Sequence, residues 1–325
     1  MRWHDPTAVG AVRKAHGGFF PIKRPGSCHL GIGVPLRASG LLRPRWAASS
    51  PPAMTRSARR RWQGWVMEVL GHRGSRIPGP ENTVEAVDAA LRAGADGVEI
   101  DVRRSADGDL MCVHDARLSR PAGRAVVRQS TEALRARGIP LLDEILEVWA
   151  GRGRLICEIK NQPGQPDFDA PRERTARALA ERLRARGWTG PRPTVADLDA
   201  GAGGITVSSF DWFAIEALRD AELAVTTAFL TMPRMSVSGG LAYARSAGHA
   251  ELHAHTSAVL GSPDAGARAR QAGVRLVTWT VTAVDAARQL RDAGVAGAIC
   301  DDPAEVRRAL GAPDASPGAG ATQDG

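Results

Sequence analysis

The chain has 325 residues, 43% of them hydrophobic, and it contains no run of about 18 apolar residues that would span a membrane. Its four widely spaced cysteines argue against a disulfide framework and favour reduced thiols in a cytoplasmic protein: Cys28, Cys112, Cys157 and Cys300. The net charge of +8 would fit a nucleic-acid partner, but residues 67–325 hold 31 basic and 34 acidic residues, so the body of the chain gives no such indication.

The excess of basic charge lies in residues 1–66, which contain twelve Lys or Arg and a single acid, Asp5. This segment is rich in Pro, Gly, Ser and Arg and has no sustained apolar period, so it cannot bury a core. We expect a disordered basic N-terminal extension, or a segment read from an upstream start that the cell does not use. A basic arm that contacts anionic partners is the alternative. Residues 312–325 are expected to form a disordered C-terminal tail.

Residues 67–311 alternate short apolar runs with helical segments, which is typical of parallel strands covered by helices. One helical stripe starts after Asn82, which we interpret as its capping residue, and ends at Gly94. Eight β-like runs over about 245 residues predict an α/β protein with a (β/α)8 TIM-barrel fold, and a doubly wound open sheet is the second candidate. The runs are 67–73, 97–102, 154–160, 205–210, 223–230, 250–259, 274–281 and 297–302.

The segment "LMCVHD" at 110–115 lies too close to the second run to be another parallel strand, which needs a crossover of a dozen or more residues. The pair Asp107-Gly108 is a strong signal for a two-residue hairpin loop. We therefore predict a short antiparallel β-hairpin extension after the second strand. With this loop, Asp101 faces His114 across the hairpin, and Glu99 shares their face.

Carboxylates recur near the carboxyl ends of the predicted barrel strands. Glu99 and Asp101 alternate with apolar residues, so they point into the barrel mouth, where charges are unfavourable unless a cation neutralises them. Glu158 and Lys160 share a face at the end of the third run. Three carboxylates predict a Mg²⁺ or Ca²⁺ site, with Lys160 close enough to hold a phosphate oxygen. An internal ion pair between Glu158 and Lys160 is the alternative.

His72 and Arg73 lie at the end of the first run. The planar guanidinium of arginine binds phosphate oxygens bidentately, and histidine transfers protons near neutral pH. Together with His114, the carboxylates and Lys160, these residues predict metal-assisted attack on a phosphodiester, with one histidine as base and the other as acid.

The motifs "GHRG", "PENT", "GVEIDV", "DGDLMCVHD", "IPLLDEIL" and "CEIK" follow one another in the order typical of glycerophosphodiester phosphodiesterases. Residues 67–311 resemble this family, whose fold is a (β/α)8 barrel of the phospholipase-C-like group. The resemblance implies a divalent cation, Mg²⁺ or Ca²⁺, bound by Glu99, Asp101 and Glu158. It implies His72 and His114 as the acid/base pair and Arg73 and Lys160 as phosphate contacts, with Glu81, Asn82 and Trp279 at the substrate pocket.

The resemblance also implies a cytoplasmic, metal-dependent enzyme that hydrolyses glycerophosphodiesters to sn-glycerol 3-phosphate and an alcohol. Its partner would be a small phosphodiester, with no specific nucleic acid and no membrane span. The segment "DARLSRPAGRA" after the HD motif departs from the family pattern and leaves the alcohol specificity open. The alternatives are a lysophospholipase-D-like or other phospholipid phosphodiesterase on the same fold, and a non-catalytic phosphoester-binding barrel.

Overall fold

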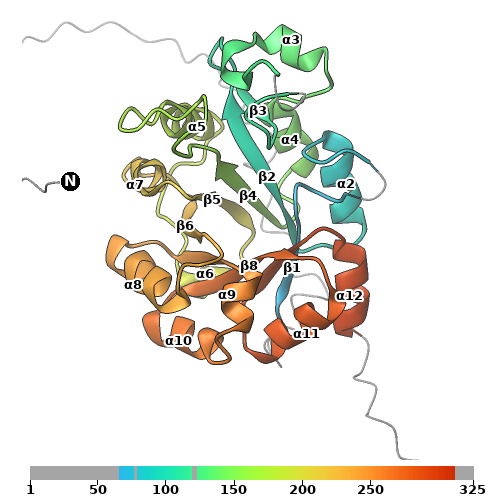
Figure 1. The fold of residues 1–325 in the computed structure, drawn as a ribbon, viewed down its shortest axis with the longest axis vertical. Coiled ribbons are helices and arrows are strands. Elements are labelled where there is room, and N and C mark those ends of the chain that lie inside the picture. Colours follow the sequence, from blue (N-terminus) through green and yellow to red (C-terminus); the bar gives the residue numbers. More distant parts are fainter. Residues whose placement is uncertain (1–65, 77–78, 119–122, 312–325) are drawn as a thin grey trace, which may run out of the picture. The chain divides into compact units, whose positions relative to one another are not determined.

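Eight parallel strands form the centre of the computed structural model, which describes residues 66–76, 79–118 and 123–311 (Figure 1). The strands are β1 Glu68–Gly71, β2 Gly97–Arg104, β4 Arg154–Ile159, β5 Gly204–Ser209, β6 Thr226–Thr231, β7 Glu251–His255, β8 Arg275–Val281 and β9 Gly297–Cys300. The ring is closed because β1 pairs with both β2 and β9. This closure excludes the open sheet and confirms the predicted TIM barrel. The predicted N-terminal extension, apart from Val66, and the C-terminal tail lie outside the described residues.

Helices cover the outside of the barrel (Figure 1). The outward-facing side chains of β2, among them Val98 and Ile100, are fully buried in one cluster with Ile145 and Trp149 of α4. No helix of the described residues is long and apolar enough to cross a membrane. The helices are α2 Val84–Arg92, α3 Thr131–Arg135, α4 Leu142–Trp149, α5 Arg174–Ala185, α6 Val195–Asp199, α7 Trp212–Arg219, α8 Val237–Ala247, α9 Thr256–Leu260, α10 Ala265–Ala272, α11 Val284–Asp292 and α12 Pro303–Gly311, with a short 3-10 helix at Val126–Arg128.

The capping residue of α2 differs from the prediction. Thr83, not Asn82, is the N-cap, and its hydroxyl accepts a hydrogen bond from the Ala86 N–H. Asn82 adopts a left-handed backbone conformation, with φ of 59°. Its side chain is engaged with Asp101 of β2, so a long-range contact outcompetes the local cap.

The hairpin extension is confirmed, because β3 Leu110–Cys112 runs antiparallel to β2. The predicted register was wrong by one residue: Val102, not Arg103, pairs with Cys112. The loop has three residues rather than two, since the Gly108 N–H donates to the carbonyl of Ser105 to close a tight turn. Gly108 has φ of +98° and supplies the left-handed residue that a three-residue hairpin loop requires.

This register changes the expected position of His114. Asp101 lies opposite Val113, whose N–H donates to the Asp101 carbonyl at 3.1 Å. His114 therefore does not face Asp101 across the ladder. It lies two residues beyond the end of β3, where the alternation of a strand no longer fixes the direction of a side chain.

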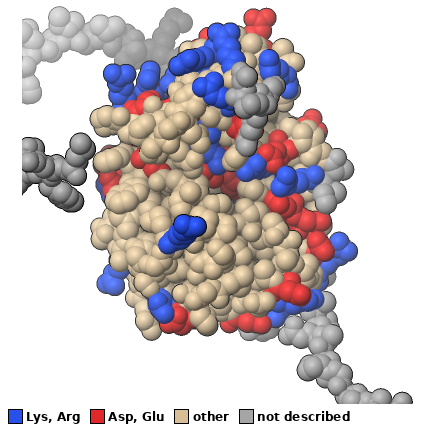
Figure 2. Space-filling model, in the orientation of Figure 1, with Lys and Arg blue, Asp and Glu red and all other residues tan. Residues whose placement is uncertain are grey.

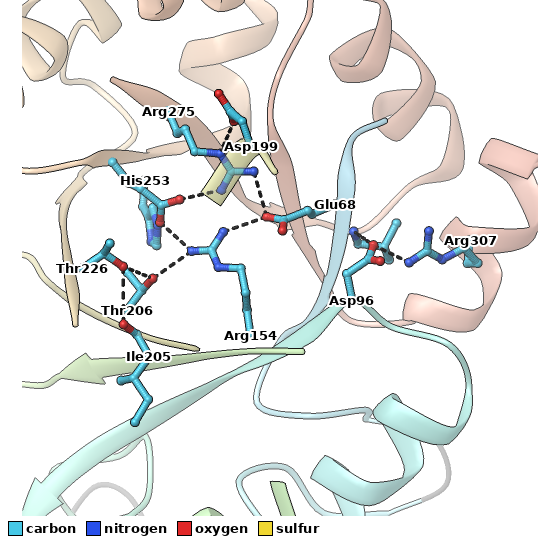
Figure 3. Close-up of polar contacts among 12 residues, drawn as sticks. Glu68, Asp96, Arg154, Asp199, Ile205, Thr206, Thr226, His253, Arg275 and Arg307 are labelled. Carbon is cyan, nitrogen blue, oxygen red and sulfur yellow. Dashed lines mark hydrogen bonds and ion pairs between the residues drawn. The ribbon is translucent and has the colours of Figure 1, made fainter. Parts of the chain in front are cut away.

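The amino-terminal end of the barrel is filled by a buried ion-pair network (Figure 3). Its four central members are the first residues of their strands: Glu68, Arg154, Glu251 and Arg275. Asp199 also contacts Arg275, and His253 also contacts Glu251. The Arg154 guanidinium lies 2.7 Å from a carboxylate oxygen of Glu68 and 2.7 Å from one of Glu251. Arg275 lies 3.1 Å and 2.8 Å from oxygens of the same two acids. Two cations thus balance two carboxylates, and the network closes the end of the barrel that is remote from the candidate site.

Candidate active site

Three carboxylates meet at the carboxyl end of two neighbouring strands. Glu99 and Asp101 lie on β2, and Glu158 lies opposite Asp101 on β4. One oxygen of each lies within 4.8 Å of the others, and all three residues are buried. The strands therefore bring together the three acids that the sequence analysis singled out as metal ligands.

Two cations lie against these acids. Lys160 places its Nζ 2.8 Å from Asp101 Oδ1 and 2.5 Å from Glu158 Oε1. Arg73 places its Nε 3.2 Å from Asp101 Oδ2, and its backbone N–H donates to Glu99 Oε2 at 3.0 Å. The predicted ion pair between Glu158 and Lys160 is thus present, but it is one contact of a larger cluster.

One buried oxygen of the cluster lacks a partner, namely Glu99 Oε1. Three carboxylates share two cations, so negative charge is in excess at a place that water hardly reaches. Carboxylate oxygens are the ligands that Mg²⁺ and Ca²⁺ prefer. Glu99, Asp101 and Glu158 accordingly fit a hard divalent cation.

The pKa values of the residues in the cluster reflect the same excess of negative charge. Burial, together with the negative charges of Asp101 and Glu158, raises the pKa of Glu99 well above its ordinary value. Burial would also raise the pKa of Asp101, but Lys160 and Arg73 outweigh it and lower this pKa. The neighbouring acids raise the pKa of Lys160 despite its burial. Without a further cation, Glu99 therefore takes up a proton more readily than Asp101.

His72 follows β1 at the barrel mouth and is held by Asp301, which follows β9. Its Nδ1 lies 2.7 Å from Asp301 Oδ1, which leaves Nε2 available for a substrate. This hydrogen bond lowers the pKa of the Asp301 carboxyl. Asp301 also pairs with Arg76. Asp301 was not predicted as a site residue, although it is an acid near the carboxyl end of a predicted run, as Glu99, Asp101 and Glu158 are.

His114 lies at the same mouth and is also held through its Nδ1, which is 2.9 Å from Asp115 Oδ1. Its backbone carbonyl accepts a hydrogen bond from Arg103 Nε at 2.9 Å. Burial, and next the positive charge of Lys160, lowers the pKa of His114, while Asp101 acts in the opposite direction. Both histidines thus have a carboxylate on Nδ1 and lie beside the acidic cluster.

Asn82 and Glu81 connect the loop after β1 to the cluster. Asn82 Nδ2 donates to Asp101 Oδ2 at 2.8 Å, and the Asp101 backbone N–H donates to Asn82 Oδ1 at 2.8 Å. Glu81 Oε1 accepts from Arg73 at 2.5 Å. Asn82 therefore orients Asp101, and Glu81 orients Arg73.

Trp279 lies two residues before the end of β8 and is partly exposed. Its ring packs edge-on against Phe210 at 5.3 Å and against His255 at 5.0 Å, measured between ring centroids. A separate cavity of about 360 Å³ lies on the other side of the mouth, between the β1–α2 loop and the segment after the hairpin. Its lining includes Asn82 and His114, together with apolar Val113, Leu118 and Ile139.

Comparison with known proteins identifies the relatives of this site. The model of the glycerophosphoryl diester phosphodiesterase family matches residues 72–305, which contain every residue of the cluster and both histidines. The chain belongs to this family. Its fold is similar to that of solved phosphodiesterases. A phosphodiesterase from Oleispira antarctica, in complex with the product sn-glycerol-3-phosphate, matches 77% of this chain and 98% of its own at 23% identity, with a TM-score of 0.62.

Among the curated relatives, "Probable glycerophosphodiester phosphodiesterase 1" of Mycobacterium tuberculosis is 52% identical to this chain over 66 residues. That match spans 20% of this chain and only 24% of the relative. The glycerophosphodiester phosphodiesterase of Caldanaerobacter subterraneus is 25% identical over 252 residues, which are 72% of this chain and 94% of the relative.

Proposed function

We propose that this chain hydrolyses glycerophosphodiesters to sn-glycerol 3-phosphate and an alcohol. The observation that carries the proposal is the pair of carboxylate-held histidines beside three buried acids and two cations, in a chain of the glycerophosphoryl diester phosphodiesterase family. The family-level activity rests on the match over residues 72–305. The roles of individual residues rest on geometry and chemistry.

The proposed mechanism gives each group of residues one task. Arg73 and Lys160 bind the phosphate oxygens and stabilise the charge that develops on them. His72 and His114 act through Nε2, one taking a proton from the attacking hydroxyl and the other giving a proton to the leaving alcohol oxygen. The lowered pKa of His114 keeps its imidazole neutral at neutral pH, as a base requires.

Glu99, Asp101 and Glu158 would hold a divalent cation, Mg²⁺ or Ca²⁺. When bound, such a cation neutralises phosphate charge and favours ionisation of an attacking oxygen. Asn82 keeps Asp101 in place for this task, and Glu81 keeps Arg73 turned to the cluster. The cavity beside His114 would receive one of the two alcohol groups of the diester. Trp279 would line another part of the substrate pocket at the barrel mouth.

A substrate panel tests the proposal. We expect the purified chain to release sn-glycerol 3-phosphate from glycerophosphocholine and to lose this activity in a chelator, with recovery on addition of Mg²⁺ or Ca²⁺. His72→Ala and His114→Ala should each lower kcat by at least about 100-fold. His255→Ala, a histidine at the mouth but outside the cluster, is the matched control and should keep most of the activity. Release of glycerol and phosphocholine would instead contradict the proposed choice of bond. Release of choline from lysophosphatidylcholine, with no activity on glycerophosphocholine, would favour the lysophospholipase-D-like alternative.

A further inference from the structure

Exposed apolar side chains are concentrated on one part of the barrel mouth. Seven large apolar side chains of the described residues are exposed, and six of them follow four consecutive strands, β4 to β7. Their exposed fractions run from 37% to 59%. Because these strands are neighbours in the barrel, the six side chains form one arc on its carboxyl-end rim. We name this arc the apolar rim; it consists of Phe168, Trp212, Phe213, Met232, Met235 and Leu260.

The part of the apolar rim that follows β6 is nearly free of charge. Residues 229–243, which run from β6 into α8, contain a single charged residue, Arg234. Arg234 is exposed between Met232 and Met235, and no carboxylate of the described residues pairs with it. Figure 2 shows the same feature as a broad area without acidic residues and almost without basic ones over α7, α8 and α9. Apolar area and one unpaired cation therefore occupy the same surface.

The rim is built on a supported platform rather than on a loose loop. The Trp212 ring lies 5.0 Å from the ring of Tyr243 and 5.9 Å from that of Phe229, although half of Trp212 remains exposed. Phe213, next to it in the first turn of α7, is 59% exposed and is the most exposed large apolar side chain of the described residues. Contiguous exposed apolar surface of this kind normally marks an interaction site.

We propose that the apolar rim docks this protein on a lipid surface. Phe213, Met232 and Met235 would enter the boundary between headgroups and acyl chains, where aromatic and unbranched apolar side chains bind. Arg234 would lie at the level of the phosphate groups, which supply the negative charge that the rim lacks. Docking in this way turns the barrel mouth, with His72 and His114, toward the membrane.

A second copy of the chain fits the rim less well than a lipid surface does. In a twofold-symmetric contact the same patch meets itself, so the surface that faces Arg234 is again part of the apolar rim. Residues 229–243 contain no acid that could pair with Arg234 across such a contact. A lipid surface offers phosphate charge and apolar depth together, and it needs no complementary shape from protruding side chains that follow four different strands.

Vesicle co-sedimentation of the full chain tests the proposal. The probes are vesicles of phosphatidylcholine and vesicles with about 30% phosphatidylglycerol, at low salt and at about 0.5 M NaCl. High salt screens the charge of residues 1–66, which is the same in every variant. We expect binding to phosphatidylcholine vesicles that persists in high salt, and the double variant F213S/M232S should lower the partition coefficient by at least about tenfold. Arg234→Gln should weaken only the additional binding to phosphatidylglycerol vesicles.

Val66→Ser is the matched control, because Val66 is the one exposed large apolar side chain of the described residues that lies away from the rim. It should bind vesicles like the wild type, and an unchanged melting temperature shows that each variant is folded. Failure of the wild type to bind in high salt, or equal binding by the double variant, would overturn the proposal. So would a concentration-dependent dimer that the double variant abolishes while vesicle binding is absent. The measurement involves no turnover, so its outcome is independent of the proposed hydrolysis.

Discussion

His72 Nδ1 lies 2.7 Å from Oδ1 of Asp301, although 229 positions separate the two residues in the chain. The contact arises because β1 and β9 pair in parallel, so the residues that follow these strands meet at the mouth. A carboxylate on Nδ1 fixes the tautomer and the direction of an imidazole and stabilises its protonated form. Asp301 is therefore a positioning residue for His72.

Asp301→Asn tests this relationship. The variant keeps the size of the side chain but favours the wrong tautomer of His72, so kcat on the substrate found for the wild type should fall by about 100- to 10 000-fold. KM and the melting temperature should change little, since the site keeps its cations and its shape. Asp302→Asn, at the next position, where the carboxylate caps the start of α12, is the matched control for activity. Equal loss in both variants would mean that this end of the barrel has only a structural role.

A second prediction concerns Glu99 and the divalent cation. In a chelator, Glu99→Gln should be at least as stable as the wild type, because the change removes a buried carboxylate whose pKa is raised by burial and by its acidic neighbours. Adding Mg²⁺ or Ca²⁺ should stabilise the wild type, by about 2.7 kcal/mol at a concentration 100 times the Kd, and should barely change the variant. Thermal unfolding with and without the cation measures both effects.

Glu181→Gln, an exposed acid on α5, is the control for this experiment and should respond to the cation like the wild type. A metal-dependent rise in the melting temperature of Glu99→Gln equal to that of the wild type would contradict the assignment of Glu99 as a ligand.

The sequence was sufficient to predict the barrel and its acidic cluster. Regular alternation of short apolar runs with helices gave the number of strands, and the period of two along β2 placed Glu99 and Asp101 on one face. Parallel neighbours then bring Glu158 opposite Asp101 without any further information. These inferences use only local periodicity and the rule that functional residues gather at the carboxyl ends of barrel strands.

The wrong predictions concern residues whose local sequence is compatible with two different structures. Asp107-Gly108 is compatible with a two-residue and a three-residue loop, and the choice between them shifts the register by one residue. Asn82 has the chemistry of a helix cap, but two hydrogen bonds to Asp101, 19 positions away, outcompete that use. The contact between Asp301 and His72 requires that the first and last strands pair, which holds in the predicted barrel but not in the open sheet that was the second candidate.

The pH dependence of stability gives a third prediction, centred on His249. This residue precedes β7, is buried, and lies 2.8 Å from the Thr227 hydroxyl through its Nδ1. Burial, and then the positive charges of Arg219 and Arg192, lowers its pKa to about 4, against a smaller opposite effect of Asp220. The unfolded chain, with an ordinary histidine pKa near 6.5, binds this proton more readily. The contribution of His249 to stability is therefore complete above about pH 6.5 and decreases as the pH falls toward 4.

His249→Asn removes this titration and keeps a hydrogen-bonding group near Thr227. The variant should be less stable than the wild type at pH 7.5, and the difference should shrink as the pH is lowered to about 4.5. Urea unfolding at a series of pH values measures it, with His255→Asn as the control. A difference that is independent of pH would show that His249 does not titrate on unfolding in this range.

The ion-pair network at the amino-terminal end of the barrel gives the last prediction. Arg154 is buried between Glu68 and Glu251, and its removal leaves two buried carboxylates with Arg275 as their remaining arginine (Figure 3). Breaking a buried pair on one side costs about 3–5 kcal/mol, so Arg154→Met should destabilise the protein by that amount at pH 7. Arg152→Met, which removes an exposed pair with Asp88, should cost about 0–1 kcal/mol and is the control.

A second substitution distinguishes the effect of an unpaired buried charge on stability from the effect of lost packing. Adding Glu251→Gln to Arg154→Met restores the balance of one acid and one cation, so the double variant should be more stable than Arg154→Met alone. Burial would raise the pKa of Glu251, but Arg154, His253 and Arg275 hold it well below its ordinary value, so the Glu251 carboxylate is charged at neutral pH in the wild type. Unfolding free energies of the four proteins in one double-mutant cycle give the coupling. If the free-energy losses of the two single variants simply add in the double variant, the destabilisation by Arg154→Met comes from lost packing. Charge balance then does not stabilise the amino-terminal end of the barrel.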